Sequence, residues 1–388
     1  MKKIITLSIS FTITIAAVVL LSMLSSGIWQ EKPEVIPAKA EIIISMDDSV
    51  TQFGTKNGLS NPSLKYIFRI TSKEDLNRTL SSFNIPPEEI KSETEKVMVL
   101  NAETESKNWF KIPLKFILWV AVLSVAFLLI IRKKINRNAR LILYISSVII
   151  FGIILGSDPS PMGTVKDAIV LYGINRVVFP PRMIAFIVFM ILVITANKFI
   201  CSWGCQFGTL QDFIFRLNRN NRDTGALTRQ FKPPFIISNT VRILFLVLFT
   251  TAAFIWSIDL FHIIDPFKIF KPSVLNSAGI AFIAALLILS LFIYRPWCHF
   301  LCPFGLAGWL GEKISIFKIK VNYNTCIACN ACSKACPSTV MEAILKRDKI
   351  IPDCYSCGTC INACPTDSIS FAPWKRPMPP EGKFDKNK

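Results

Sequence analysis

The sequence predicts a mostly α-helical membrane protein with a six-helix transmembrane bundle, a small exported helical domain and a C-terminal α+β domain. The first observation is composition: 52% of the 388 residues are hydrophobic and 18% are charged, which is too apolar for a water-soluble domain. The second is a set of six apolar runs that approach the length needed to cross a bilayer. The third is that eight of the twelve cysteines follow the last run in two similar segments.

The six apolar runs cover residues 4–28, 112–131, 141–156, 183–200, 243–258 and 278–294. The first run follows Lys2 and Lys3 and predicts an N-terminal transmembrane anchor over residues 1–28. A cleaved secretory signal is the alternative, because Ala38-Lys39-Ala40 resembles a cleavage site, although it lies well downstream of the apolar stretch. Either outcome exports the residues that follow.

The basic residues predict the orientation, because Lys and Arg in short loops resist translocation. Two loops are rich in them: the loop between runs two and three, and the loop between runs four and five. Six crossings then place the C-terminal domain and all twelve cysteines on the cytoplasmic side of the inner membrane, with residues 29–110 on the exported side. The net charge of +18 therefore serves membrane topology, and a nucleic-acid partner is not predicted.

Residues 29–110 predict a small helical domain. Helix starts are indicated by Asn61-Pro62, by the capping pattern from Ser72 to Asp75, and by the proline pair before Glu88. The segment has no cysteine, no histidine and no glycine-rich phosphate loop. It is interpreted as a docking module or folded spacer.

The predicted transmembrane core, residues 111–320, contains an internal repeat. Asp158-Pro159 follows run three, and Cys201-x3-Cys205 ends run four; Asp265-Pro266 follows run five, and Cys298-x3-Cys302 follows run six. Repeats that run in the same direction pack about a pseudo-two-fold axis along the membrane normal. This packing would bring the two Cys-x3-Cys segments together at the cytoplasmic membrane surface.

The strongest motif is C-x2-C-x2-C-x3-C-P, which occurs twice within residues 321–372. One run contains Cys326, Cys329, Cys332 and Cys336, and the other contains Cys354, Cys357, Cys360 and Cys364. In this spacing three thiolates of one run and the fourth of the other hold each 4Fe-4S cluster. The predicted ligands are therefore Cys326, Cys329, Cys332 and Cys364 for one cluster, and Cys354, Cys357, Cys360 and Cys336 for the other.

This domain is predicted to be a bacterial-type two-cluster ferredoxin. Zinc knuckles are disfavoured, since they require neither a third cysteine two residues on nor a proline after the last. Small residues near the ligands let backbone N–H groups approach cluster sulfur, and Tyr355 and Ile361 are expected to shield the clusters from water. Residues 373–388 are predicted to be a disordered tail.

The thiols of Cys201, Cys205, Cys298 and Cys302 form a second candidate metal site. Thiols four residues apart share one face of a helix. If both segments stay helical and the repeats pair, the four thiols could bind a metal or a further cluster, or act as a dithiol relay. The alternative is that they are buried apolar side chains, with the nearby Gly and Pro residues marking helix ends.

Haem is not predicted. The chain has only two histidines, His262 and His299, which are expected at opposite membrane faces and so cannot ligate one haem. A quinone is favoured as the partner within the membrane, and His262 between Asp259 and Asp265 could accept a quinol proton, although an ordinary interfacial histidine is the simpler interpretation.

These motifs resemble the polyferredoxin-type membrane proteins of the NapH and NosR kind. The resemblance covers residues 141–371 and implies that Cys298, Cys302 and Pro303 form a C-x3-C-P motif and that the eight ferredoxin cysteines are ligands. Two features depart from the family: Cys205 is followed by Gln206 instead of proline, and the exported domain is small and lacks the flavin attachment sequence of the NosR branch. A bound flavin is therefore not predicted.

The resemblance implies electron passage between a cytoplasmic donor or the quinol pool and an exported redox partner. The primary hypothesis is accordingly a membrane-bound iron–sulfur electron carrier, a component of an oxidoreductase system instead of a stand-alone enzyme. The alternative hypothesis is a redox-sensing or assembly factor for an exported metalloenzyme. A transporter is disfavoured, because no run contains a buried acidic pair or an obviously broken midplane helix.

Overall fold

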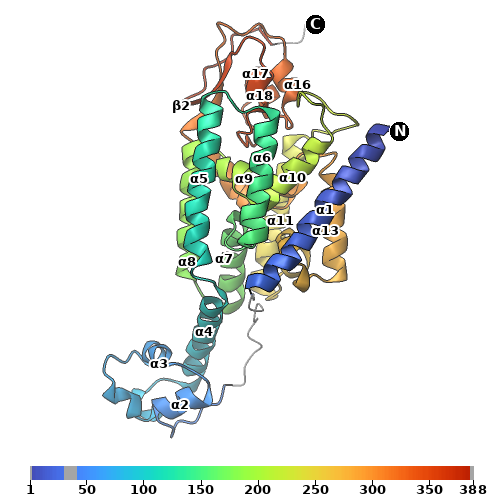
Figure 1. The fold of residues 1–388 in the computed structure, drawn as a ribbon. Coiled ribbons are helices and arrows are strands. Elements are labelled where there is room, and N and C mark those ends of the chain that lie inside the picture. The colour runs from blue at the N-terminus through green and yellow to red at the C-terminus, as the bar shows by residue number, and fades with distance from the viewer. Residues whose placement is uncertain (1, 30–41, 385–388) are drawn as a thin grey trace. The chain divides into compact units, whose positions relative to one another are not determined.

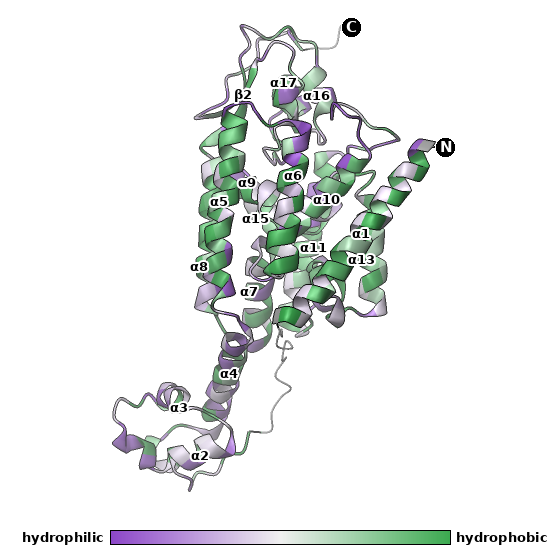
Figure 2. Ribbon diagram, viewed as in Figure 1, coloured by the Kyte–Doolittle hydropathy of each residue, from purple (hydrophilic) through white to green (hydrophobic). Residues whose placement is uncertain are grey.

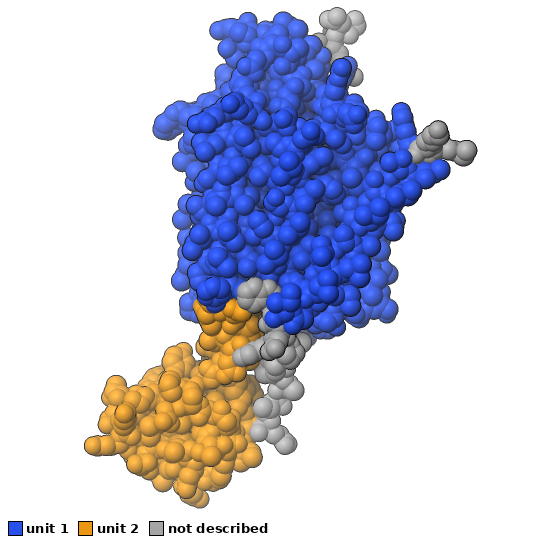
Figure 3. All heavy atoms as spheres, viewed as in Figure 1, with its two compact units in different colours: residues 1–30, 110–169, 180–388 blue, residues 31–109, 170–179 orange. Residues whose placement is uncertain are grey.

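The computed structural model describes residues 2–29 and 42–384 and divides into two compact units (Figure 3). Unit 1 comprises residues 1–30, 110–169 and 180–388, and unit 2 comprises residues 31–109 and 170–179. The cleavage-like Ala38-Lys39-Ala40 lies outside the described residues.

Unit 2 is helical. Its elements are α2 (Val50–Lys56), α3 (Asn61–Ile67), the 3₁₀ turns η1 (Glu74–Asn77) and η2 (Leu80–Phe83), and α4 (Pro87–Ser106). The side chains of Phe53, Leu64 and Leu80 lie at the centre of its apolar core. The starts of α3 and α4 agree with the sequence prediction, while the predicted capping pattern at Ser72 precedes only the short turn η1. The exported location of this unit remains a prediction.

Unit 1 contains the apolar helices (Figures 1 and 2). The long helices are α1 (Lys2–Trp29), α5 (Lys111–Ile131), α6 (Arg137–Ser147) continued by the π-helix η3 (Val148–Ile154), and α11 (Phe235–Ile255). Within the described residues, these four segments are long and apolar enough to cross a membrane. The shorter apolar helices α8 (Pro180–Ala196) and α13 (Ser277–Leu289) occupy runs four and six. Each predicted run thus overlaps an apolar helix, four of which have full spanning length.

Two helices begin earlier than their apolar runs, and each includes a buried arginine just before the run. Helix α11 begins at Phe235 and includes Arg242, which is buried and forms an ion pair with Asp353 at 2.9 Å. Helix α6 begins after the cap residue Asn136 and includes Arg140, which is also buried. Hydropathy places the boundary after these residues because it treats every arginine as exposed.

The helices of runs four and six end before the cysteines. Helix α8 is followed by α9 (Phe199–Trp203) and α10 (Gln206–Leu217), and α13 is followed by α14 (Pro296–Phe300) and α15 (Pro303–Lys313). Each Cys-x3-Cys pair therefore straddles a helix break, with Cys205 and Cys302 at the N-caps of α10 and α15. The expectation that each pair shares one helix face is wrong, because the backbone turns between the two thiols.

The remaining elements of the helical core are short, apart from α7 (Pro161–Asn175), which joins the two units in sequence. They are α12 (Phe261–Ile264) and the 3₁₀ turns η4 (Pro266–Phe270) and η5 (Pro272–Val274). Helix α1 packs against η3, η4, η5 and α10. The predicted anchor segment is therefore an integral part of unit 1.

The C-terminal domain has the predicted α+β character. Strands β1 (Phe317–Val321) and β2 (Ile369–Pro373) pair antiparallel with Ile319 opposite Phe371, and α16 (Ala331–Ala335), α17 (Val340–Lys346) and α18 (Thr359–Asn362) lie between them in sequence. Strand β2 packs against α5, and β1 packs against α8. The sheet thus seats this domain on the helical core.

The segment after β2 contacts the ferredoxin domain as far as Phe384, while the disorder expected for residues 373–388 stays a prediction. The Arg376 guanidinium donates to the Ile319 carbonyl at 3.0 Å, and the Lys383 ammonium donates to the Tyr323 carbonyl at 2.6 Å. The Phe384 ring packs edge-on against Tyr323. Residues 385–388 lie outside the described residues.

Candidate metal centres

Twelve cysteines line three cavities, four to each. The first, named here the distal cavity, is lined by Cys326, Cys329, Cys332 and Cys364 and encloses about 320 Å³. The second, the proximal cavity, is lined by Cys336, Cys354, Cys357 and Cys360 and encloses about 360 Å³. These are the two interleaved sets that the spacing predicts, with the fourth cysteine of each run facing the cavity of the other.

The chemistry of these cavities fits a 4Fe-4S cluster, which needs four thiolates around a central volume. All twelve cysteines are free of disulfides. Across residues 2–29 and 42–384, no three His, Cys, Asp or Glu side chains form a group that could hold a single metal ion. A bound cluster supplies a one-electron redox couple, and the protein supplies the thiolates and the hydrogen bonds around them.

The two ferredoxin cavities differ in exposure. Cys329 in the distal cavity is exposed, whereas Cys336, Cys354 and Cys360 in the proximal cavity are buried. Burial raises the pKa of the Cys354 thiol to about 12. Because cluster ligands are thiolates, assembly at the proximal cavity must displace protons from buried thiols.

Hydrogen bonds lower the pKa of one distal thiol. Partial burial alone would raise the pKa of Cys364, but donors on Thr366 and Ser368 bring it below its usual value. The Ser368 backbone N–H donates to the Cys364 sulfur at 3.2 Å. Such donors also stabilise the more negative state of a cluster ligated by that sulfur.

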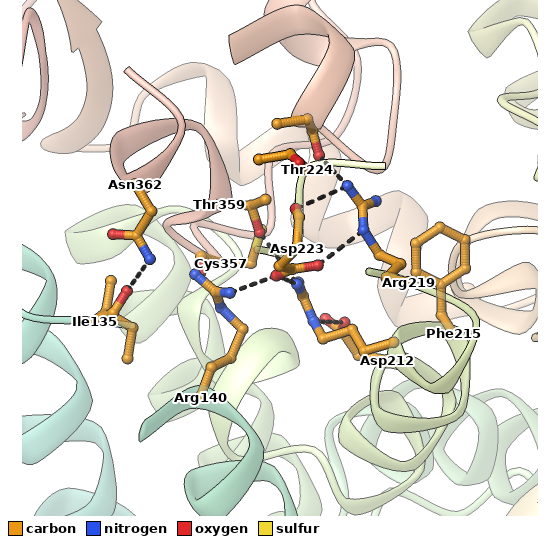
Figure 4. Close-up of polar contacts among 12 residues, drawn as sticks. Ile135, Arg140, Asp212, Phe215, Arg219, Asp223, Thr224, Cys357, Thr359 and Asn362 are labelled. Atoms are coloured by element: carbon orange, nitrogen blue, oxygen red, sulfur yellow. Dashed lines mark hydrogen bonds and ion pairs between the residues drawn. The ribbon is translucent and has the colours of Figure 1, made fainter. Parts of the chain in front are cut away.

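The proximal cavity is attached to the helical core by buried arginines (Figure 4). Arg140 on α6 donates to the Cys357 carbonyl at 2.9 Å, and Arg219 donates to the Ala335 carbonyl at 2.7 Å. Arg216 on α10 donates to the Thr359 hydroxyl at 3.2 Å. All three guanidiniums are buried and form ion pairs with Asp223. Four charged side chains from the core therefore hold the backbone that carries the proximal thiols.

A second buried group of charges surrounds Asp353, the residue before Cys354. Asp353 forms ion pairs with Lys198 and Arg242, and these cations lower its pKa although burial alone would raise it. The Glu312 carboxyl accepts the Cys354 backbone N–H at 3.0 Å. Burial raises the pKa of Glu312 to about 8, so this carboxyl is mostly protonated at neutral pH.

The third cavity, the core cavity, lies within the helical core. Cys201, Cys205, Cys298 and Cys302 line it, and it encloses about 350 Å³. The predicted meeting of the two Cys-x3-Cys segments is therefore confirmed. The cavity also borders Met162 and Phe267, which follow the two Asp-Pro segments predicted for the outer side.

The depth of the core cavity differs from the sequence prediction, which places these thiols at the end of the helices. Helices α9 and α10, which flank Cys205, lie beside the middle of α5 and α6 (Figure 1). All four thiols are buried. The helix breaks turn the chain back into the core at this level.

Sequence reasoning missed the charged residues that support the cavities. Arg140 and Lys198 are close to the ends of apolar runs, and Asp353 directly precedes a cluster cysteine. The available sequence signal for such a supporting residue was a charged side chain next to an apolar run or next to a predicted ligand. Its partner could not be identified, because Arg140 and Cys357 are 217 positions apart.

The two histidines lie on different short helices. His262 is exposed on α12, whereas His299 is buried on α14, where its ring lies 5.5 Å from that of Tyr355. Tyr355 and Ile361, the two predicted shields, are both buried.

Two family models match the chain. A 4Fe-4S dicluster domain model matches residues 318–365, and a 4Fe-4S binding domain model matches residues 178–223 and 275–322. The first match contains all eight ferredoxin cysteines and none of the core-cavity cysteines. The two segments of the second match contain the four core-cavity cysteines and no others.

Three relatives are similar to parts of the chain. Putative electron transport protein YccM of Escherichia coli is 30% identical over 168 residues, 41% of this chain and 46% of the relative. An uncharacterized protein of Methanocaldococcus jannaschii is 24% identical over 176 residues, 43% and 64% respectively. Regulatory protein NosR of Pseudomonas aeruginosa is 27% identical over 155 residues, 37% and 21%.

The chain thus spans less than two thirds of each of these relatives. No solved structure matches it. The matched domains and relatives confirm the resemblance to polyferredoxins of the NapH and NosR kind that the motifs predict: the chain carries 4Fe-4S domains and is similar to a protein described as a putative electron transport protein and to NosR.

Proposed function

We propose that this chain is a multi-pass protein of the inner membrane that transfers electrons through two 4Fe-4S clusters in its C-terminal domain. Cys326, Cys329, Cys332 and Cys364 hold one cluster in the distal cavity, and Cys354, Cys357, Cys360 and Cys336 hold the other in the proximal cavity. The observation that carries the proposal is the pair of interleaved four-cysteine cavities, one exposed and one attached to an apolar helical core.

Metal analysis tests the cofactor. The full-length chain, purified in detergent without oxygen, is expected to contain at least about eight iron atoms and to give a low-temperature radical signal when reduced. Zinc in place of iron, or iron without acid-labile sulfide, would refute the proposal.

Two matched variants assign the clusters. Cys329→Ser removes a distal ligand and Cys360→Ser a proximal one, so each is expected to remove one set of signals and to spare the other. Loss of both sets from Cys329→Ser, with the protein still folded, would contradict two independent cavities.

The proposed orientation places the ferredoxin domain in the cytoplasm and residues 29–110 on the exported side, supported by the basic loops. The exposed positions Ser92 and Lys349 offer a direct test. In intact cells a membrane-impermeant thiol reagent is expected to label Ser92→Cys and to leave Lys349→Cys unlabelled above the background of the parent chain. The reverse pattern would overturn the orientation.

The route of electrons proposed here links a cytoplasmic donor or the quinol pool to an exported redox partner. The apolar helices support a quinone as the lipid-soluble participant. Adding a short-chain quinol to the oxidised protein in vesicles is expected to produce the spectrum of reduced clusters. Reduction by a soluble cytoplasmic donor alone would remove the quinone from the proposal.

A second candidate function is redox sensing or assembly of an exported metalloenzyme, favoured by the similarity to a protein described as regulatory. The two functions differ in whether cluster reduction by quinol and maturation of the exported client can be separated. A variant with normal cluster reduction by quinol but without maturation of the exported client would support this candidate, and loss of both together would support electron transfer.

A further inference from the structure

The two halves of the ferredoxin domain contain equivalent loops. Residues 327–334, named here the distal loop, follow the first cysteine of one motif, and residues 355–362, the proximal loop, follow the first cysteine of the other. In each loop two left-handed residues flank the middle cysteine: Ala328 and Asn330 with φ of 55° and 57°, and Ser356 and Gly358 with φ of 48° and 74°. The two loops therefore have the same backbone turn and can be compared position by position.

The helical core covers the proximal loop. Arg140 donates to the Cys357 carbonyl at 2.9 Å, and the Asn362 side-chain amide donates to the Ile135 carbonyl. Tyr355, the first residue of the loop, is 4% exposed. This half of the domain thus shows how such a loop is used for attachment: apolar contact at the turn, and polar contacts on either side of it.

The distal loop presents the equivalent face to solvent. Ile327, which corresponds to Tyr355, is 63% exposed. The cluster ligand Cys329 and its neighbour Asn330 are exposed as well. A large apolar side chain beside an exposed cluster ligand is a feature of surfaces that bind a partner, because contact removes the apolar surface from water and brings a second redox centre close.

Lysines surround the distal loop. Lys334 is an exposed residue of the loop itself. Lys232 donates to the Ser333 carbonyl at 2.8 Å, and Lys383 donates to the Tyr323 carbonyl at 2.6 Å. Within residues 2–29 and 42–384, none of these three lysines forms an ion pair. Their charges are therefore available to an outside partner.

Acidic side chains do little to offset these charges. Residues 317–384 contain nine Lys or Arg residues and five Asp or Glu residues. One of the acids, Asp353, is buried and paired with the core. Three more already have basic partners, in the pairs Glu342–Lys346, Asp367–Lys133 and Glu381–Arg347. The surface around the distal loop is thus positive, and its complement is a negatively charged partner.

The position of the loop favours a soluble protein over a lipid surface. Helix α16, which begins within the distal loop, lies beyond the ends of the long apolar helices α5 and α6 (Figure 1). The strands β1 and β2 occupy the side of the domain that packs on α8 and α5. A bilayer that surrounds the apolar helices would therefore leave the distal loop in water.

We propose that the distal loop, with Lys232, Lys334 and Lys383 around it, is the docking surface for a small, soluble, acidic electron-carrier protein. The inference rests on the proposed function, because it specifies the cytoplasmic donor of the distal cluster. Partner carboxylates would face the lysines, and Ile327 would be buried in the contact. One electron leaves the cofactor of the carrier and reduces the distal cluster by one, while no covalent bond is made or broken.

Electron-transfer kinetics test the surface. The oxidised full-length protein, in detergent without oxygen, is mixed with a reduced acidic flavodoxin, and cluster reduction is followed by absorbance. Lys334→Glu is expected to lower the second-order rate constant about tenfold at low ionic strength, because it reverses a steering charge. The difference should shrink at about 0.5 M salt, where the Debye length is only a few ångströms.

Lys375→Glu is the matched control. Lys375 is also exposed but follows strand β2, outside the distal loop, so the same change in net charge should leave the rate constant near that of the parent. Equal losses in the two variants, or a parent rate that does not depend on salt, would overturn the docking surface. Dithionite should reduce both clusters to the same extent in all three proteins, and failure of the parent in this step would count against the proposed function instead.

Two further measurements keep the proposal testable. If Lys334→Glu lowers the iron content, Lys334→Gln removes the charge without reversing it and should slow the reaction about threefold. A polarity-sensitive fluorophore on Lys334→Cys should shift to shorter wavelength when flavodoxin is added, and should not respond when phosphatidylglycerol replaces phosphatidylcholine around the reconstituted protein. The reverse pattern would assign the surface to lipid headgroups and overturn the inference.

Discussion

The distal and proximal cavities carry ligands of identical spacing in different surroundings. The distal cavity includes the exposed Cys329 and is partly closed by Phe384 from the C-terminal segment. The proximal cavity is bordered by Tyr294 of the helical core, and Arg140 and Arg219 hold the backbone of its ligand segments. One motif thus forms an exposed cavity at one end of the domain and a cavity attached to the core at the other.

This difference predicts that the proximal centre depends on the core for its stability and the distal centre does not. Buried ion pairs fix the position of the ferredoxin domain on the core. They also make this attachment sensitive to substitution, because a buried charge that loses its partner destabilises the folded protein. Exposed charges have no such effect. Substitutions on either side of this contrast test it.

The largest effect is expected for Asp223→Ala. It leaves three buried guanidiniums without their shared carboxylate, which should destabilise the folded protein by about 3–5 kcal/mol. Thermal unfolding of the detergent-solubilised protein measures the loss, and iron analysis should show the proximal cluster lost before the distal one.

Asp367→Asn is the matched control for that substitution. Asp367 also joins the ferredoxin domain to the core, through Lys133 at 2.7 Å, but its side chain is 72% exposed. The expected change is about 0–1 kcal/mol, because water screens the pair. Equal destabilisation by the two substitutions would remove the distinction between buried and exposed attachment.

A smaller loss is expected from Gly358→Ala, which lies between two proximal ligands. Gly358 has a φ of +74°, and an added Cβ would lie 2.7 Å from the Ile135 side chain of the core. The left-handed backbone costs roughly 1–2 kcal/mol and the overlap with Ile135 a further ~1–3 kcal/mol.

Gly382→Ala separates these two contributions. Gly382 has the same φ of +74°, and nothing lies within 4 Å of its added Cβ. Its loss should therefore be limited to the backbone contribution of about 1–2 kcal/mol. Equal unfolding temperatures for the two variants would show that Ile135 moves aside and that the domain is loosely seated.

The grouping of the eight ferredoxin cysteines around two cavities was predictable because it depends on local sequence. A C-x2-C-x2-C-x3-C-P run specifies its own cluster geometry, and the interleaving of Cys336 and Cys364 follows from two such runs. The apolar runs were predictable for the same reason, since membrane helices satisfy their hydrogen bonds internally and need only length and hydropathy.

The supports of the site were not predictable, since they depend on partners distant in sequence. From hydropathy alone, Arg242 marks the end of a membrane span. Only its ion pair with Asp353, distant in sequence, shows that it is buried within the helix. The break at Gly204 likewise requires the close approach of Gly208 to the Cys201 carbonyl. Hydropathy and helical period both describe single elements, so neither could place a turn within the core.

Arg219→Gln sharpens the electrostatic side of the comparison. Arg219 is buried beside the Ala335 carbonyl. When Arg219 is replaced, Asp223 still forms ion pairs with two other guanidiniums, those of Arg140 and Arg216. Loss of this positive charge disfavours the reduced proximal cluster by roughly 1–2 kcal/mol, or about 40–90 mV for a one-electron couple. A redox titration followed by electron paramagnetic resonance should show the proximal potential falling alone. Arg347→Gln, at an exposed pair with Glu381, should leave both potentials nearly unchanged because solvent screens it.

A small effect on stability and a larger one on oxidation are expected for Phe384→Ala, which opens the distal cavity. The Phe384 ring lies 5.9 Å from that of Tyr323, and an aromatic pair of this kind contributes about 0.5–1.5 kcal/mol beyond its buried area. Its removal should lower the unfolding temperature by a few degrees at most, yet should speed the bleaching of the distal cluster in air, because exposed thiolate sulfur is the most readily oxidised. The proximal cluster, enclosed by the core, should bleach at its original rate. If both clusters bleached faster together, the two cavities would share one path to solvent, and the contrast between an exposed cavity and one attached to the core would fail.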